Sequence, residues 1–153
     1  MNTLSRIIWA FSDTWKENYF KYRKDPDSPD FNEEKINKPL DEKILFIYNK
    51  LYEYIEKLPD YSPELFEPCF HPEDPTSPYF LTHLPIHVIC GFSGELDFGQ
   101  NFQDPIHMKM IFKGIKNYKK FKTQLISLVK LLCKKGSPVT ICTRYNETPL
   151  YLI

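Results

Sequence analysis

The stretch that decides the fold runs from Leu128 to Ile153 and reads LVKLLCKKGSPVTICTRYNETPLYLI. It opens with apolar residues at helical spacing, and lysines occupy the other faces of the expected helix. Gly136 is placed to end that helix, because a residue without a Cβ adopts the left-handed conformation of a C-terminal cap without strain. After an extended finger (residues 137–147), Thr148 and Pro149 supply the N-cap and first position of another helix. The stretch therefore predicts a helix, a glycine stop, a finger and a new helix start.

The turn of the finger is expected near Asn146, because asparagine tolerates a positive φ better than most residues. Arg144 and Tyr145 precede it, and both are residue types that dominate binding hot spots. Their consecutive placement at a turn has no evident role in a core, although Tyr145 packing on a neighbouring finger is an alternative.

This order of elements resembles the ankyrin repeat, and the match needs no gap. Gly136 stands on the helix-ending glycine of the family and Val139 on its finger valine. The motif T-P-L of the family is matched by Thr148, Pro149 and Leu150. The paired valines and the leucine run of the family are matched, in order, by Leu128, Val129, Leu131, Leu132 and Cys133.

The chain departs from the family pattern at four of these positions. Pro138 replaces the usual Asp, Thr140 the usual Asn, and Asn146 the turn Gly. Tyr151 stands where the family has the His that follows T-P-L. Pro138 has no backbone N–H, so the finger has one hydrogen-bond donor fewer near its start.

Two further helix starts of this kind are degenerate. At the first, Pro85, Ile86 and His87 stand on the family's P-L-H, with Leu84 in place of the Thr. The second is Asp104-Pro105-Ile106-His107, with the aspartate as N-cap. The resemblance is thus specific over residues 128–153 and degenerate over about 84–127. It implies a short, irregular array of helix-turn-helix repeats over residues 83–153.

Residues 1–59 are expected to form a helical N-terminal or capping segment without repeats. Apolar residues from Leu4 to Phe20 recur at helical spacing and predict a helix that Asn2 or Thr3 caps and that runs to about Arg23. We expect it to face the core; an exposed aromatic stripe that binds a partner is the alternative.

A second helix is expected from Leu40 or Asp41 to about Leu58, where Pro59 ends it. The residues from Lys24 to Lys38 read as a polar linker. The two helices would then form an antiparallel hairpin at the N-terminal end of the array.

Residues 60–82 read as a proline-rich ordered loop. The prolines prevent any regular element longer than a turn, whereas the interleaved aromatic residues indicate packing against the helices. At the other end, the helix that begins at Thr148 stops after one turn, and one turn alone is unstable in water. We therefore expect an array truncated at its C-terminus, with a short tail packed as a cap as the alternative.

The charge pattern bears on partners. The chain has 153 residues, 42% of them hydrophobic, and its 20 basic and 20 acidic residues give a formal net charge of zero. A nucleic-acid binder driven by bulk electrostatics would show a basic excess. The lysine-rich run Lys113 to Lys122 (KGIKNYKKFK) interleaves aromatic residues and is compatible with binding a single strand, but we favour a solvated helix face.

No sequence feature indicates a membrane or secreted protein. No apolar run approaches the ~20 residues of a membrane helix, and the N-terminus has no secretory pattern. The 4 cysteines do not resemble a disulfide framework, so we expect reduced thiols and a cytoplasmic location.

One group of residues could hold a metal. It consists of Cys69, His71, His83, His87 and Cys90. Zinc takes such nitrogen and sulfur ligands, so a small zinc-stabilised module or enzyme is the alternative function. A nucleophilic pair of Cys69 or Cys90 with His71 or His107 is a weaker alternative, because nothing supplies an orienting third residue. The ligand spacing matches no standard site, and we expect no catalytic residue, metal or cofactor.

The sequence thus predicts an all-α, non-catalytic protein. The resemblance implies a protein–protein interaction module, a scaffold or adaptor whose partner is another protein rather than a nucleic acid or a membrane. It places the partner-binding residues at the finger tip, at Thr143, Arg144, Tyr145 and Asn146.

Overall fold

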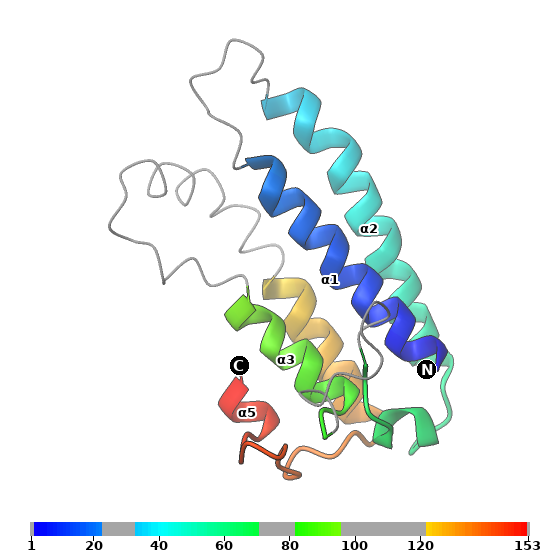
Figure 1. Cartoon of the computed structure of the whole chain (residues 1–153). Helices are drawn as coiled ribbons and strands as arrows, with labels where there is room; N and C mark the ends of the chain where they lie inside the picture. The colour runs from blue at the N-terminus through cyan, green and yellow to red at the C-terminus, as the bar shows by residue number, and fades with distance from the viewer. Residues whose placement is uncertain (1, 23–32, 71–81, 96–121, 153) are drawn as a thin grey trace.

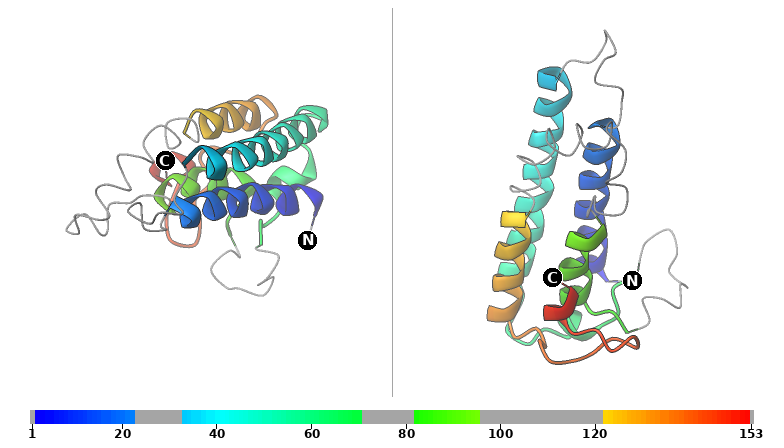
Figure 2. Two further views of the ribbon diagram at one scale, coloured as in Figure 1. Left: turned by 90° about the horizontal axis from the view of Figure 1, so that it is seen from above. Right: turned by 90° about the vertical axis from the view of Figure 1, so that its left-hand side faces the viewer.

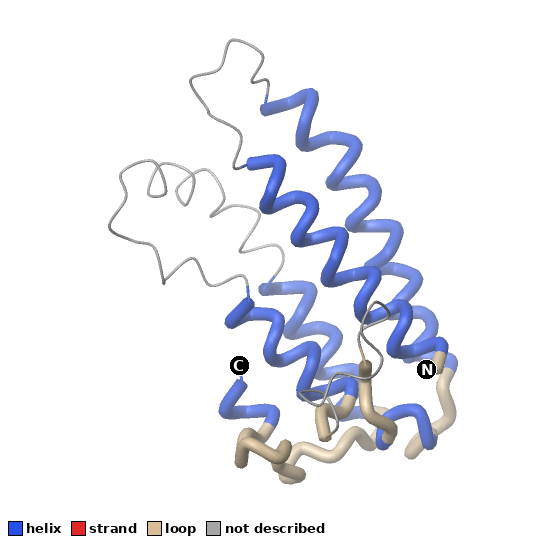
Figure 3. Tube along the Cα trace, in the orientation of Figure 1, coloured by secondary structure: helices blue, strands red, loops and turns tan. Residues whose placement is uncertain are grey.

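The computed structural model describes residues 2–22, 33–70, 82–95 and 122–152 (Figure 1). Within these ranges every regular element is helical and none is a strand, which confirms the all-α prediction (Figure 3). The elements are α1 (Thr3–Tyr22), α2 (Glu33–Lys57), the 3-10 helix η1 (Pro63–Phe66), α3 (Pro85–Glu95), a helix at residues 122–134 and α5 (Pro149–Leu152).

Helices α1 and α2 lie side by side and antiparallel, as predicted (Figures 1 and 2). Leu4 and Ile8 of α1 and Leu51 and Ile55 of α2 are fully buried. Burying one such aliphatic side chain contributes about 1.5–3 kcal/mol relative to leaving it exposed. The apolar stripes that the sequence shows therefore hold the hairpin together.

The start of α2 corrects one prediction. The helix begins at Glu33, so residues 33–38 are helical and Pro39 lies inside the helix rather than ending a linker. Glutamate and lysine are strong helix formers, which favours extending the helix backwards through this segment. Proline restricts the residue before it but does not always end a helix. The other end, at Lys57, agrees with the predicted end near Leu58.

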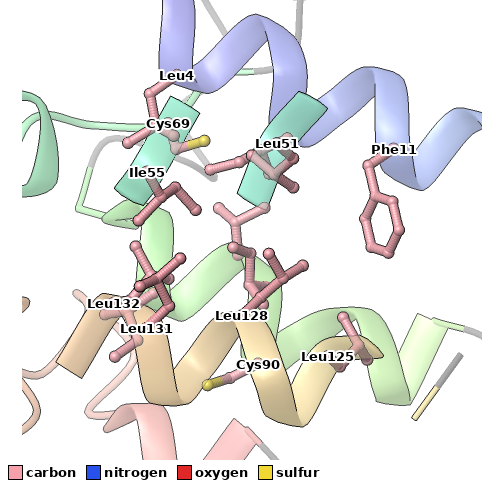
Figure 4. Packing of buried hydrophobic residues seen from close by; sticks show 14 of the residues in the cluster. Leu4, Phe11, Leu51, Ile55, Cys69, Cys90, Leu125, Leu128, Leu131 and Leu132 are labelled. Carbon is pink, nitrogen blue, oxygen red and sulfur yellow. The ribbon is translucent and has the colours of Figure 1, made fainter. Parts of the chain in front are cut away.

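A second pair of helices packs against this hairpin. Helix α3 and the helix at residues 122–134 add their apolar faces to one common core (Figures 1 and 4). Ile86 and Ile89 come from α3, and Leu128 and Leu132 from residues 122–134; all four are fully buried. Leu65 of η1 belongs to the same cluster. The described ranges thus share one core rather than forming two.

The segment around η1 fastens the start of α1. Asn2 caps the helix, because its Oδ1 accepts the Ser5 N–H at 2.8 Å. A Glu64 carboxylate oxygen accepts the Leu4 N–H at 3.2 Å, and the Tyr54 hydroxyl of α2 donates to the same carboxylate at 2.8 Å. A carboxylate at a helix N-terminus also interacts favourably with the helix dipole. Glu64 therefore joins α1, α2 and η1 at one point.

The helix at residues 122–134 ends at Gly136, as predicted. Gly136 has φ +93, its N–H donates to the Cys133 carbonyl at 3.1 Å, and the Ser137 N–H donates to the Leu132 carbonyl at 3.0 Å. These two bonds and the positive φ make a Schellman cap. A Cβ at this glycine would lie 2.5 Å from Cδ1 of Tyr61, so the ring also excludes any larger residue.

Lys135 ties this helix end to the end of α2. Its ammonium donates to the Leu58 carbonyl at 2.9 Å, and its own carbonyl accepts the Tyr61 N–H at 2.8 Å. A cation at a helix C-terminus is stabilising because it faces the negative end of the dipole. The two helices therefore end at a shared set of hydrogen bonds.

Candidate site at the tip of the finger

The finger (residues 137–147) leaves Gly136, passes below the N-terminal end of α3 and ends at α5 (Figures 1 and 2). Helix α5 begins at Pro149, as the Thr148-Pro149 pair predicts, and packs against α3. The finger contains no regular secondary structure. Its position must therefore come from individual contacts with α3 and with the turn at its own tip.

His87 is the main contact between the finger and α3. Its Nδ1 accepts the Leu84 N–H at 3.1 Å, and its Nε2 donates to the Ile141 carbonyl at 2.7 Å. This arrangement requires neutral imidazole with the proton on Nε2. Burial lowers the pKa of His87 below 6.5, whereas the Ile141 carbonyl and Glu147 act in the opposite direction. One side chain thus caps α3 and holds the middle of the finger.

The tip of the finger is a closed turn. The Asn146 N–H donates to the Thr143 carbonyl at 3.0 Å, and the Thr143 N–H donates to the Glu147 carbonyl at 2.9 Å. Asn146 has φ 59, which confirms the prediction of a positive φ there. A left-handed residue after a turn of this kind is typical of short hairpin loops. The Thr143 hydroxyl also accepts the Tyr145 N–H at 3.2 Å.

Three of the four predicted partner-binding residues lie at the surface of this turn. Arg144 and Asn146 are exposed, and Tyr145 is 48% exposed. The Arg144 guanidinium lies 5.5 Å from the centroid of the Tyr145 ring, within the range of a cation–π interaction. Thr143 is 3% exposed, so its part is to build the turn rather than to offer a contact surface.

The tip is also anchored to the segment before α3. The Arg144 N–H donates to the Thr82 hydroxyl at 2.6 Å. Glu147 accepts from the Thr143 hydroxyl at 3.3 Å, and its carboxylate lies 3.9 Å from Nε2 of His83. Sequence reasoning did not assign a role to Thr82 or Glu147. No local pattern marks them, because each acts on a segment that only the fold brings near.

Of the residues proposed as an alternative metal site, the structure brings His83 and His87 together, with ring centroids 6.3 Å apart. In the described part of the chain, no group of three or more histidine, cysteine or acidic residues is placed to hold a metal ion. Both nitrogens of His87 are used by backbone groups. Cys69 and Cys90 lie at different sides of the core (Figure 4). His71 lies outside the described residues.

The two buried thiols are also poor nucleophiles. Burial raises the pKa of Cys69 and that of Cys90 to about 12. A thiol is reactive as the thiolate, so neither group is activated at neutral pH. The histidines proposed to pair with them, His71 and His107, lie outside the described residues. The degenerate helix start at residues 104–107 and the lysine-rich run before Lys122 also lie outside the described residues.

Comparison with protein-family models, with curated proteins and with solved structures gives no match for this chain. None of the described helices is long and apolar enough to cross a membrane. Function must therefore be argued from the geometry of the tip and of the surfaces around it.

Proposed function

We propose that this chain is a protein–protein interaction module, an ankyrin-like scaffold or adaptor of the cytoplasm that presents the finger tip to a partner protein and performs no catalysis. The observation that carries the proposal is the exposed stack of Arg144 on Tyr145, on a turn that backbone hydrogen bonds close. Arginine and tyrosine are the residue types most enriched in binding hot spots.

Preorganisation supports this function. Binding by a flexible loop costs about 0.5–1.5 kcal/mol for each side chain that becomes immobilised. At the tip, the Thr82 hydroxyl fixes the backbone of Arg144, and the closed turn fixes Tyr145. The side chains already rest on each other before any partner arrives. These side chains therefore lose less conformational entropy on binding than the side chains of a flexible loop would.

The order of elements supports the ankyrin-like part of the proposal. A helix ends at a left-handed glycine, a finger follows, and a new helix begins at a proline. The histidine of the Pro85-Ile86-His87 helix start holds that finger through the Ile141 carbonyl. In this view α3, the helix at residues 122–134 and α5 belong to successive repeats, with α1 and α2 as a cap.

A double substitution at the tip tests the proposal. The variant Arg144→Ala with Tyr145→Ala removes the stack, and neither residue belongs to the hydrophobic core, although the Tyr145 ring lies 6.2 Å from that of the buried His83. A matched control is Phe46→Ala with Lys50→Ala, because Lys50 lies 4.9 Å from the centroid of the exposed Phe46 ring on α2. Each variant and the wild-type chain serve as bait for affinity capture from a cell extract, followed by quantitative mass spectrometry.

Proteins that the wild-type chain captures should be lost from the tip variant by about tenfold or more, which corresponds to about 1.4 kcal/mol, and should be retained by the control. Both variants should melt like the wild type, because exposed substitutions usually change stability by less than about 0.5 kcal/mol. Equal capture by the tip variant and the wild type would move the binding surface away from residues 144–146.

A further inference from the structure

A cavity of about 380 Å³ lies between the C-terminal half of α2 and the helix at residues 122–134. Tyr52 and Glu56, one helical turn apart, line it from α2. Ser127, Lys130, Leu131 and Lys134 line it from the other helix, and Lys135 lines it directly after that helix. None of these residues belongs to the finger. The volume lies within the range of sites that take small molecules.

The cavity wall carries three lysines and one carboxylate, and one of the lysines, Lys135, donates to the Leu58 carbonyl. Lys130 and Lys134 are four residues apart, so they lie on the same face of the helix, where equal charges repel. Within the described residues neither ammonium group has a hydrogen bond or an ion pair. An anion placed between them would replace this repulsion by two attractions.

Stabilisation of the helix C-terminus does not fully explain why Lys130 and Lys134 stand at these positions. Cations do favour a helix C-terminus. Here, however, the Leu131, Leu132 and Cys133 carbonyls already accept the N–H groups of residues 135, 137 and 136. The neighbouring Lys135 donates to the carbonyl that ends α2 and lies 4.0 Å from Asp60. Lys135 therefore lines the cavity with its ammonium group already bound to the end of α2, whereas Lys130 and Lys134 line it without a hydrogen bond or ion pair among the described residues.

The other residues of the cavity indicate the chemistry of the rest of the ligand, the part that carries the anionic group. Leu131 is 6% exposed and forms an apolar wall, and the half-buried Tyr52 ring packs at 6.0 Å from the Tyr48 ring. A flat apolar body fits against an aromatic ring and an aliphatic side chain. The Ser127 hydroxyl and the Glu56 carboxylate supply a further donor and acceptor for hydroxyl groups.

We propose that this cavity binds a phosphate monoester carried on a small ring or other apolar body. The phosphate lies between Lys130 and Lys134, and the body rests on Tyr52 and Leu131. Lysine binds phosphate as a point charge, which suits a rotating monoester group. The site is independent of the function proposed for the finger tip.

Pyridoxal 5′-phosphate is a suitable probe, because it carries a phosphate monoester and an aldehyde on one aromatic ring. The aldehyde condenses with a lysine amine and releases water; borohydride then reduces the imine, and the modified lysines are located by peptide mapping. Lys130 or Lys134 should be modified at a probe concentration at least tenfold lower than the exposed Lys50 and Lys122. Pyridoxal, which lacks the phosphate, should show no such preference. Equal modification of all four lysines would overturn the proposal.

A pair of variants tests whether the two lysines act together. Lys130→Gln should reduce the modification of Lys134 to the level of Lys50, because the phosphate loses one of its two cations. Lys122→Gln, on the same helix but outside the cavity, should leave it unchanged. Both positions are exposed, so both variants should fold. Undiminished modification of Lys134 in Lys130→Gln would also overturn the proposal.

Protection from modification distinguishes a soluble ligand from a lipid headgroup. Phenyl phosphate is the soluble competitor, and phosphatidylcholine vesicles that contain phosphatidic acid present the same monoester on a membrane. Stronger protection by phenyl phosphate assigns the site to a soluble molecule, and stronger protection by these vesicles than by phosphatidylcholine alone assigns it to a headgroup. Protection by neither would contradict a phosphate site.

Discussion

The α1–α2 hairpin and the finger are held in place by different kinds of interaction. The hairpin rests on fully buried aliphatic side chains such as Leu4, Ile8 and Leu51. In the finger, Val139 is 49% and Ile141 46% exposed, and the backbone is fixed by a few hydrogen bonds from polar side chains. A segment with little apolar burial thus has a defined shape, but each bond that defines it is worth only about 1 kcal/mol. Single substitutions in the hairpin and in the finger should therefore change the free energy of unfolding by different amounts.

The largest effect should come from Leu132→Asp, which should unfold the α1–α2 hairpin and release the finger. Leu132 is fully buried in the common core, and an unpaired charge there should destabilise the fold by more than about 4 kcal/mol. Urea unfolding followed by circular dichroism measures the loss. Ile126→Asp, on the same helix but 45% exposed, is the control and should cost less than about 1 kcal/mol. Similar losses in the two variants would mean that Leu132 does not face a core.

Leu51→Ala should weaken the hairpin by about 3 kcal/mol, since it leaves a cavity at a fully buried position. Leu45→Ala, at a 48% exposed position on the same helix, should change the free energy of unfolding by less than about 1 kcal/mol. The same urea titration measures both. A loss at Leu45 that equals the loss at Leu51 would contradict the face of α2 that the structure assigns to the core.

His87→Ala should release the finger at a cost of about 2 kcal/mol, because two hydrogen bonds of about 1 kcal/mol each are lost. Hydrogen exchange of the Thr143 and Asn146 amides should accelerate, while protection in the α1–α2 hairpin should remain. His87→Gln keeps one acceptor and one donor and should retain part of the protection. Unchanged exchange at the tip in His87→Ala would show that other contacts hold the finger.

The same histidine should make stability depend on pH. Its pKa in the folded chain is lowered from 6.5 by burial, so below pH 6.5 the unfolded chain binds more protons than the folded one. The contribution of His87 is therefore complete above pH 6.5 and declines as the pH falls through the lowered value. In His87→Gln this part of the decline should be absent, which urea titrations from pH 8 to pH 5 can measure. Identical pH profiles would contradict a buried neutral imidazole.

The smallest effects should come from two glycines, with opposite signs. Gly136→Ala should cost about 1–2 kcal/mol, because an alanine is strained at φ +93 and its Cβ would meet the Tyr61 ring. Gly91→Ala should instead stabilise α3 by about 0.5–1 kcal/mol, since a Cβ there meets nothing within 4 Å. Repeating Gly136→Ala in a Tyr61→Ala background separates the clash from the backbone strain. A neutral Gly136→Ala would contradict the left-handed cap.

Local chemistry explains which features the sequence could predict. The bounds of α1, the glycine stop at Gly136, the positive φ of Asn146 and the helix start at Pro149 each depend on residues within one turn of one another. Those signals are short-range, so a single sequence reveals them. The start of α2 was missed because a proline usually marks a boundary and here does not.

The remaining features join residues that are far apart in the chain. His87 meets Ile141 across 54 positions, and Lys135 meets Leu58 across 77. Thr143 was expected to contact a partner, yet it is buried because the turn needs its hydroxyl and backbone inside. The cavity walls at Tyr52 and Lys130 likewise come from separate helices. No pattern within one segment contains this information.

The bond from the Leu4 N–H to Glu64 also bears on the order of events at the ribosome. The two residues are 60 positions apart, so Leu4 is synthesised well before the carboxylate that accepts its N–H group. At about 5–20 residues per second, translation across that interval takes roughly 3–12 s. Throughout that time α1 lacks both the carboxylate at its start and the helix that covers its apolar face. Until Glu64 has been made, nascent α1 therefore depends on Asn2 alone for a side-chain acceptor at its N-terminus.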